Sequence, residues 1–259
     1  METGDRTPVV ALEGISKSFG AVEALSDVDF AAYGGEVVAI VGDNGAGKST
    51  LVKTISGIHA ADAGRILFEG REVAIHSPSD AAGLGIAVVY QDLALCDNLD
   101  VVQNLYLGRE RVGEGPASVT RQLDERAMEK RAFKLLDRFA VTIVNLRSEV
   151  GTLSGGQRQQ VAIARSLLGD PKVVVLDEPT AALGVRQTAT VLSLVRRLAE
   201  DGHAVVVISH NLNDVFEVAD RIVVLRLGRA VGDHRASETS REEIVNAITG
   251  GTPVDGGPR

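Results

Sequence analysis

The chemistry that this chain could perform begins in a glycine-rich stretch, Gly42–Thr50, which reads GDNGAGKST. A β-branched run at 36–41 precedes it and a helical pattern at 48–56 follows it, so the glycines form a turn between a buried strand and a helix. Such a turn points main-chain N–H groups at phosphate, and the helix N-terminus adds partial positive charge. The spacing predicts that Lys48 contacts the β- and γ-phosphates of a nucleotide and that Ser49 gives Mg²⁺ a hydroxyl ligand. The expected nucleotide-binding residues of this loop are Gly42, Asp43, Asn44, Gly45, Ala46, Gly47, Lys48, Ser49 and Thr50.

Two acidic residues follow an apolar strand pattern at 173–176. Ligands bind α/β sheets at the carboxyl ends of the strands, so Asp177 and Glu178 are expected at the ligand-binding edge. Asp177 is suited to hold Mg²⁺ through water, and Glu178 to accept a proton from the attacking water or to orient it. An acidic turn after a core strand would explain the pair if it stood alone, and the phosphate loop favours the catalytic interpretation.

The third chemical signal is the stretch 153–157, which reads LSGGQ. Ser154 can cap a helix that begins with glycines, which leaves main-chain N–H groups uncovered for an anion. The chain then has two phosphate-seeking helix starts, at Lys48 and at Ser154, which one protomer would not bring to the same γ-phosphate. Two copies arranged head to tail would solve this, because each would lend its second helix start to the nucleotide of the other.

Composition limits the classes of protein to consider. The 259 residues are enough for one large domain, or for a main domain with a smaller insert. A net charge of −8 and a pI of about 5.2 give no overall basic surface for nucleic acid. The first ten residues lack the apolar core of a secretion signal, and the apolar runs are far shorter than the roughly 20 residues that span a bilayer. The five histidines have no metal-ligand spacing, and Cys96, the single cysteine, is expected to be a buried small apolar residue. We expect a soluble, cytosolic protein.

Hydrophobic patterns predict an α/β core around the phosphate loop. Strand patterns at 9–19, 27–30 and 65–70 predict antiparallel β structure around the first strand–loop–helix unit, and the apolar run 85–90 predicts a parallel strand. Signals from 95 to 151 are helical. One apolar face at helical spacing consists of Met128, Ala132, Leu135, Leu136 and Phe139.

The α/β pattern then returns, with helices expected at 155–168, 185–200, 211–219 and after Ser240, and strands at 173–176, 204–209 and 221–225. The predicted organisation is therefore a single domain at 8–250 followed by a flexible tail at 251–259. Its core would comprise 8–94 and 155–250, with an N-terminal antiparallel β subdomain. A helical subdomain at about 95–154 would be inserted into that core, with a surface linker at 113–116.

The order of these motifs resembles that of ATP-binding cassette (ABC) ATPases. The resemblance implies that the α/β core is that of a phosphate-loop NTPase. The resemblance covers roughly residues 8–250, and it adds Gln91 and His210, each of which follows a strand pattern. It implies that Gln91 senses Mg²⁺ and joins the core to the helical subdomain, and that His210 contacts the γ-phosphate. It also implies that Glu178 is the catalytic carboxylate and that Asp177, Ser49 and Gln91 serve the metal. Phe19 corresponds to an aromatic residue that stacks on adenine, with Val22 nearby. The implied signature residues, which contact the ATP of the partner protomer, are Leu153, Ser154, Gly155, Gly156 and Gln157.

The sequence departs from the family pattern after the acidic pair. The family commonly reads S-A-L-D where this chain has Ala181-Ala182-Leu183-Gly184, so the aspartate that usually crosses the dimer interface is absent. The segment 181–188, AALGVRQT, nevertheless resembles the variant in ATPases of simple-sugar importers, as does QNLYLGRE at 103–110. Those importers often carry two fused cassettes, so a single cassette implies a homodimer.

The resemblance implies an ATP- and Mg²⁺-dependent subunit of a bacterial importer for a monosaccharide such as ribose, xylose or fructose. Its partners would be membrane permease subunits, contacted through the surface at 92–107, and indirectly a periplasmic or lipid-anchored sugar-binding protein. Its place would be the inner face of the cell membrane. Three alternatives stay open: an importer ATPase for another solute, a cassette ATPase that acts without a membrane partner in translation, repair or cofactor assembly, and a nucleotide sensor that does not hydrolyse ATP.

Overall fold

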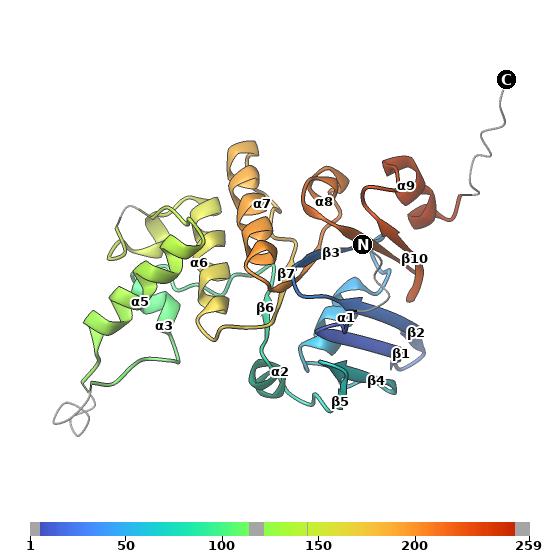
Figure 1. The fold of residues 1–259 in the computed structure, drawn as a ribbon, viewed down its shortest axis with the longest axis horizontal. Coiled ribbons are helices and arrows are strands. Elements are labelled where there is room, and N and C mark those ends of the chain that lie inside the picture. Colours follow the sequence, from blue (N-terminus) through green and yellow to red (C-terminus); the bar gives the residue numbers. More distant parts are fainter. Residues whose placement is uncertain (1–5, 114–121, 144, 252–259) are drawn as a thin grey trace.

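The computed structural model describes residues 6–113, 122–143 and 145–251. Its two sheets lie beside a group of helices that forms one end of the molecule (Figure 1). The part of the predicted linker at 114–116 and the tail from 252 onward lie outside the described residues. The limits assigned to the core and to the helical subdomain stay predictions.

The central sheet is the element that positions the candidate site. In the described part of the chain it has six strands, ordered β10-β9-β3-β8-β7-β6, and the five from β9 to β6 are parallel. Parallel strands covered on both faces consist of nearly continuous apolar residues, and β3, β7 and β8 do. The strands of this sheet are β3 (Glu36–Val41), β6 (Ile86–Val89), β7 (Val173–Asp177), β8 (Ala204–Ile208), β9 (Arg221–Arg226) and β10 (Arg229–Arg235).

The strand order determines which loops meet. β8 lies between β3 and β7, with Val206 paired to Val38 on one side and to Val175 on the other. β6 flanks β7 at the end of the sheet. The segments that follow these four strands therefore emerge at one edge, although they are separated by up to about 160 residues in sequence.

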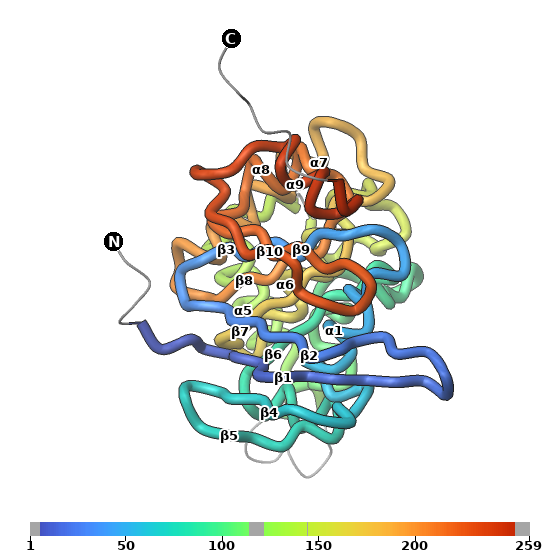
Figure 2. Tube along the Cα trace, turned by 90° about the vertical axis from the view of Figure 1, so that its right-hand side faces the viewer, coloured from blue at the N-terminus to red at the C-terminus, as the bar shows by residue number. Residues whose placement is uncertain are grey.

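A second, antiparallel sheet confirms the β structure predicted for the first third of the chain. Its order is β2-β1-β4-β5, and Figure 2 shows it beneath the strands of the central sheet. Its strands are β1 (Val10–Phe19), β2 (Val22–Ala32), β4 (Ala63–Phe68) and β5 (Arg71–Val73). Helix α1 (Lys48–Ile55) joins the core between the two sheets, because Leu51, Val52 and Ile55 are buried in one cluster with residues of β1 and β3.

The remaining helices cover the central sheet. α3, α5, α6 and α7 share one apolar cluster, in which the predicted face from Met128 to Phe139 is buried except for half-buried Leu135. A smaller cluster joins α8 and α9 to β3 and β9. These helices are α2 (Pro78–Leu84), α3 (Val101–Tyr106), α5 (Glu125–Arg138), α6 (Gly155–Leu167), α7 (Val185–Glu200), α8 (Leu212–Val218) and α9 (Arg241–Thr249), with a 3₁₀ turn at Val150–Thr152.

The region 95–151 is less helical than predicted, because side-chain hydrogen bonds replace helical ones in part of it. Asn104 is fully buried, and its amide nitrogen donates to the carbonyl oxygens of Cys96, Leu99 and Asp100 at 2.9–3.1 Å. Its amide oxygen accepts from the Cys96 N–H. Cys96 itself is half-buried and not fully buried as predicted.

Three elements had no strong sequence pattern. β10 is a polar edge strand whose residues are mostly exposed, so it lacks apolar alternation. β5 and α2 are three and seven residues long, too short for a period to show. The strand predicted at 27–30 extends over the longer range of β2.

Arg221, at the start of β9, ties the two sheets together. Its guanidinium donates to Glu36 of β3 and Asp233 of β10, each at 2.7 Å, and to the Ala31 carbonyl oxygen of β2. Burial alone would lower the pKa of Arg221, but the hydrogen bonds and charges of these two carboxylates raise it above its ordinary value. The arginine therefore stays charged and holds β2 against the central sheet.

Candidate functional site

The predicted phosphate loop connects β3 to α1 and depends on glycine at two close approaches. Gly47 has a left-handed φ of +105°, and a Cβ there would lie 2.7 Å from the Ala24 carbonyl oxygen. A Cβ on Gly42 would collide with the Leu225 carbonyl oxygen. Both neighbours are backbone atoms that cannot move aside, so the surrounding strands require glycine here.

The loop is also held by hydrogen bonds from outside itself. The Gly228 N–H donates to the Ala46 carbonyl oxygen at 3.0 Å, and the Gly228 carbonyl oxygen accepts from the Ser26 N–H at 2.8 Å. The turn between β9 and β10 thus connects the antiparallel sheet to the loop. Lys48 lies over the loop, and its ammonium donates to the carbonyl oxygens of Gly42 and Asp43 at 2.7 and 2.9 Å. Nine of the eleven residues predicted to bind nucleotide, 42–50, form this loop and the first turn of α1, and the other two are Phe19 and Val22.

Asp177, the last residue of β7, faces the same loop. Burial raises the pKa of its carboxyl above the ordinary 3.8, and the neighbouring Glu178 raises it further, while the charges of Lys48 and Lys53 oppose the shift. Helix α1 packs against β7, so Asp177 at the end of that strand lies close to the phosphate loop. A carboxylate that is costly to ionise gains from a nearby cation.

Glu178 and His210 meet at the adjacent strand end. The Glu178 Oε1 lies 2.9 Å from the His210 Nδ1, and the Glu178 N–H donates to the Ile208 carbonyl oxygen at 2.9 Å. Glu178 has a left-handed φ of +50°, a conformation that costs energy in a residue with a Cβ. The Glu178 side chain is 15% exposed and the His210 side chain 72%. The carboxylate is therefore sheltered, and the imidazole covers it from the solvent side.

This donor set fits Mg²⁺. The ion prefers oxygen ligands and usually keeps water or phosphate oxygens in part of its shell. Ser49 and Asp177 supply a hydroxyl and a carboxylate oxygen on neighbouring elements. Within the described residues no three His, Cys, Asp or Glu side chains cluster to form a metal site made of protein alone. A metal held by the Ser49 and Asp177 oxygens would take its remaining ligands from water or phosphate.

Gln91, Phe19 and Val22 lie at the borders of this site. Gln91 follows β6, the neighbour of β7, and its side chain is exposed. Phe19 pairs with Val22 at the end of the β1–β2 hairpin, and the two are 44% and 66% exposed. The Phe19 and His59 rings pack edge to face, with their centroids 5.0 Å apart. Phe19 keeps exposed surface on which a base could stack.

The LSGGQ stretch begins α6 as predicted, and its helix start is a capping box. The Ser154 Oγ accepts from the Gln157 N–H at 3.4 Å, and the Gln157 side chain accepts from the Ser154 N–H at 3.0 Å. The S-x-x-Q spacing could have revealed this from the sequence. Gly156 also allows close packing, because a Cβ there would lie 2.8 Å from the Gln187 Cβ of α7. α6 and α1 lie in different parts of the molecule, with β6 and β7 between them (Figure 1).

The position of the missing aspartate, Gly184, is the N-cap of α7. Its backbone is extended, with φ −74° and ψ 161°, and its N–H donates to the Gln187 Oε1 at 3.3 Å. An aspartate here would cap the helix with its own side chain, whereas glycine leaves capping to the backbone and to Gln187. Ala182, two residues earlier, has a left-handed φ of +61°.

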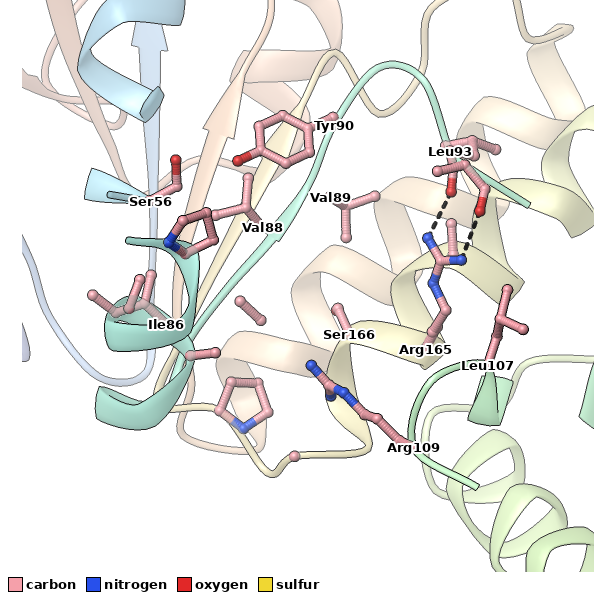
Figure 3. A pocket seen from close by; sticks show the side chains of 18 of the residues that line it. Ser56, Ile86, Val88, Val89, Tyr90, Leu93, Leu107, Arg109, Arg165 and Ser166 are labelled. Atoms are coloured by element: carbon pink, nitrogen blue, oxygen red, sulfur yellow. Dashed lines mark hydrogen bonds between the residues drawn. The ribbon is translucent and has the colours of Figure 1, made fainter. Parts of the chain in front are cut away.

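A groove of about 340 Å³ opens beside the segment after Gln91 (Figure 3). Its wall consists of α2, β6 and α6, and it includes Tyr90, Leu107 and Arg109. Arg165 of α6 donates to the carbonyl oxygens of Leu93 and Ala94 at 2.7 and 2.8 Å, and burial lowers the pKa of its guanidinium. The segment after Gln91 is therefore fastened to the helix that LSGGQ begins.

Comparisons with known proteins agree with this geometry. Residues 25–181 match the family model described as ABC transporter. A xylose/arabinose import ATP-binding protein of Sulfolobus acidocaldarius is 44% identical over 93% of this chain and 94% of its own length. A fructose import ATP-binding protein of Rhizobium meliloti is 45% identical over 94% of each chain. A ribose import ATP-binding protein of Chromobacterium violaceum is 42% identical over 93% of this chain, which spans only 47% of that relative.

Solved structures give the same result. A nucleotide-free ATP-binding cassette from an ABC transporter superposes with a TM-score of 0.79 at 31% identity, over 93% of this chain and 95% of that one. The dimeric structure of a bacterial ABC transporter cassette superposes with a TM-score of 0.72 at 26% identity, over 88% of this chain and 98% of that one. Among the described residues, no helix has both the length and the apolar character needed to cross a membrane. The chain belongs to the ABC transporter family, and its fold is that of the family's ATP-binding cassettes.

Proposed function

We propose that this chain is the ATP-hydrolysing subunit of an importer for a monosaccharide, and that it drives transport through separate membrane permease subunits. The observation that carries the proposal is the meeting of Lys48, Asp177, Glu178 and His210 at one sheet edge. The named activities of the xylose/arabinose, fructose and ribose relatives support the choice of solute. Import of another solute is the alternative, because solute selectivity would lie in the permease and the binding protein.

Each polar group at the edge has a defined task in this proposal. The loop N–H groups and Lys48 bind the phosphates of ATP, and Ser49 and Asp177 hold Mg²⁺, which neutralises phosphate charge. Glu178 accepts a proton from the attacking water or orients it. His210 is exposed enough to contact the γ-phosphate and keeps the Glu178 carboxylate in place. Gln91 reports the state of the metal site to the helices beyond it, and Phe19 stacks on adenine with Val22 beside it.

A second copy of the chain would complete each site. The start of α6 lies apart from the phosphate loop of its own protomer (Figure 1), so residues 153–157 would contact the nucleotide of the partner. ATP would then favour the closed dimer, and hydrolysis the open one, because only the closed form contacts nucleotide from both sides. The family member solved as a dimer supports this arrangement.

The groove in Figure 3 is the proposed contact with the permease. It lies at the segment after Gln91, and Arg165 links that segment to α6. A permease helix seated there would respond to movement of both halves of the ATP site. The chain would then lie in the cytoplasm, on the inner face of the membrane. The sugar-binding protein would be an indirect partner through the permease.

The Glu178→Gln variant tests the catalytic assignment. We expect turnover to fall by about a hundredfold or more, because a neutral amide cannot accept the proton. ATP binding should persist, and the ATP-bound dimer should live longer. Steady-state ATPase assays, nucleotide titration and size-exclusion chromatography measure these quantities. Glu217→Gln, an exposed acid on α8, is the control, and undiminished hydrolysis by Glu178→Gln would remove Glu178 from this role.

Mixing two inactive variants tests the shared site. Lys48→Ala disables the phosphate loop, and Ser154→Arg places bulk and charge on the start of α6. A mixed dimer keeps one intact site, in which the Ser154→Arg protomer supplies the phosphate loop and the Lys48→Ala protomer supplies the start of α6. Random pairing at equal concentrations should restore about a quarter of wild-type activity, since half the dimers are mixed and each keeps one of two sites. Activity no higher than the mean of the separate variants would contradict the shared site.

Asp177→Asn should stabilise the nucleotide-free protein at neutral pH. Burial raises the native pKa of this carboxyl above its unfolded value, so its ionised form disfavours folding at pH above the native pKa. The gain in melting temperature should shrink as the pH falls through the native pKa and vanish below 3.8, where the carboxyl is protonated in both states. Calorimetry from pH 7 downward measures it, with exposed Asp137→Asn as the control. The same variant should lose the added stability that Mg²⁺ with ATP gives the wild type. If the nucleotide-free variant melts at the wild-type temperature at neutral pH, the buried charge of Asp177 does not disfavour folding.

Affinity capture of the full chain from detergent-solubilised membranes tests the partner. We expect a polytopic permease to co-purify, and Leu107→Glu to abolish its capture while ATP binding persists. Leu107 is 46% exposed and lines the groove. The control is Phe133→Glu, an exposed apolar residue of α5 outside the groove. Capture of ribosomes or DNA would instead favour a cassette ATPase that acts without a membrane partner.

A further inference from the structure

One buried carboxylate joins the two segments that carry the proposed catalytic groups. Asp214, on α8, is 8% exposed, and each of its oxygens accepts a hydrogen bond from a different segment. The Oδ2 accepts from the Thr180 hydroxyl at 2.6 Å, and the Oδ1 accepts from the Asn211 amide nitrogen at 2.9 Å. Thr180 follows Glu178 by two residues, and Asn211 follows His210 directly.

The bond to Asn211 has no freedom to rearrange. The Asn211 amide oxygen accepts from the Asn213 N–H at 3.0 Å and so caps α8, which fixes the orientation of its amide. The Asn211 N–H donates to the Ser209 Oγ at 3.0 Å. Exchanging the amide oxygen and nitrogen would break both the cap and the bond to Asp214. Both polar atoms of the Asn211 side chain therefore bind α8, and they anchor the segment that carries His210.

The bond to Thr180 holds a strained segment. Glu178 has a left-handed φ of +50°, which neighbouring contacts must maintain in a residue with a Cβ. One such contact is the hydrogen bond of its N–H to Ile208. Another is the buried Thr180–Asp214 bond, two residues further along. In the described residues, Asp214 forms no ion pair, so these hydrogen bonds are the interactions that compensate its burial.

We infer that Asp214 is a positioning residue for ATP hydrolysis, which holds Thr180 and Asn211 so that the Glu178 carboxylate and the His210 imidazole stay 2.9 Å apart. This inference rests on the roles proposed above for Glu178 and His210. Asp214 would act through Thr180 and Asn211, without touching the nucleotide itself. Its loss would displace both groups relative to each other, and small displacements of reacting groups cost large factors in rate.

Kinetics of paired variants test the inference. Thr180→Val removes the hydroxyl with little change of shape, Thr180→Ser keeps it, and Asp214→Asn keeps one acceptor but turns an N–H toward the Asn211 amide. We expect Thr180→Val and Asp214→Asn to lower kcat about tenfold, with KM for ATP changed less than twofold. Thr180→Ser should retain wild-type kcat.

The control is Thr190→Val, which removes an exposed hydroxyl that bonds only within α7, and it should leave kcat unchanged. Rates are taken per nucleotide-binding site, so that a loss of folded protein does not count as a loss of turnover. If Asp214→Asn does not fold, Thr180→Val and Thr180→Ser carry the test. Wild-type kcat in Thr180→Val, with only its melting temperature lowered, would overturn the inference. Wild-type turnover in Glu178→Gln would instead overturn the proposed function on which the inference rests.

Discussion

The parallel pairing of β3, β8, β7 and β6 is the constraint on which the candidate site depends. β3, β7 and β8 are buried over almost their whole length and β6 at both ends, and all four end at the same edge of the sheet. Hydrophobic burial of these strands therefore determines the positions of polar groups that lie up to about 160 residues apart in sequence, namely Lys48, Gln91, Asp177 and His210. A change of strand order would separate the phosphate loop from its acids without altering a single motif.

The sheet edge stores conformational and electrostatic energy. Burial beside another acid raises the pKa of Asp177 and makes its carboxyl costly to ionise, and Glu178 has a left-handed backbone. A cation bound beside Asp177 would relieve the electrostatic cost. The hydrogen bond to the end of β8 maintains the backbone conformation of Glu178. Strain beside a candidate site is the pattern expected where stability has been exchanged for function.

The sequence predicted the elements whose pattern is local. The phosphate loop, α6, α7 and the parallel strands follow from glycine spacing, caps and apolar runs, and the structure confirms them. It did not predict β10, because a polar edge strand is defined by its partner β9 and not by its own residues. It did not predict Arg221 or Asp214 either, because each acts through hydrogen bonds to segments that are distant along the chain or separated from it by a turn. Such contacts exist only once the fold has formed, so no window of sequence contains their signal.

Gly184 shows how a departure from a family pattern can be tolerated by the fold. It occupies the N-cap of α7, where the loss of a capping aspartate costs little because glycine is itself a common N-cap residue. Gln187 also accepts from the Gly184 N–H, and it packs against Gly156 at the start of α6. One side chain thus stabilises the start of α7 and sets its distance from the LSGGQ helix. The segment can keep its shape without the aspartate. What the substitution removes is therefore a charge that would face a second protomer. Any dimer contact at this position must rely on backbone and apolar groups.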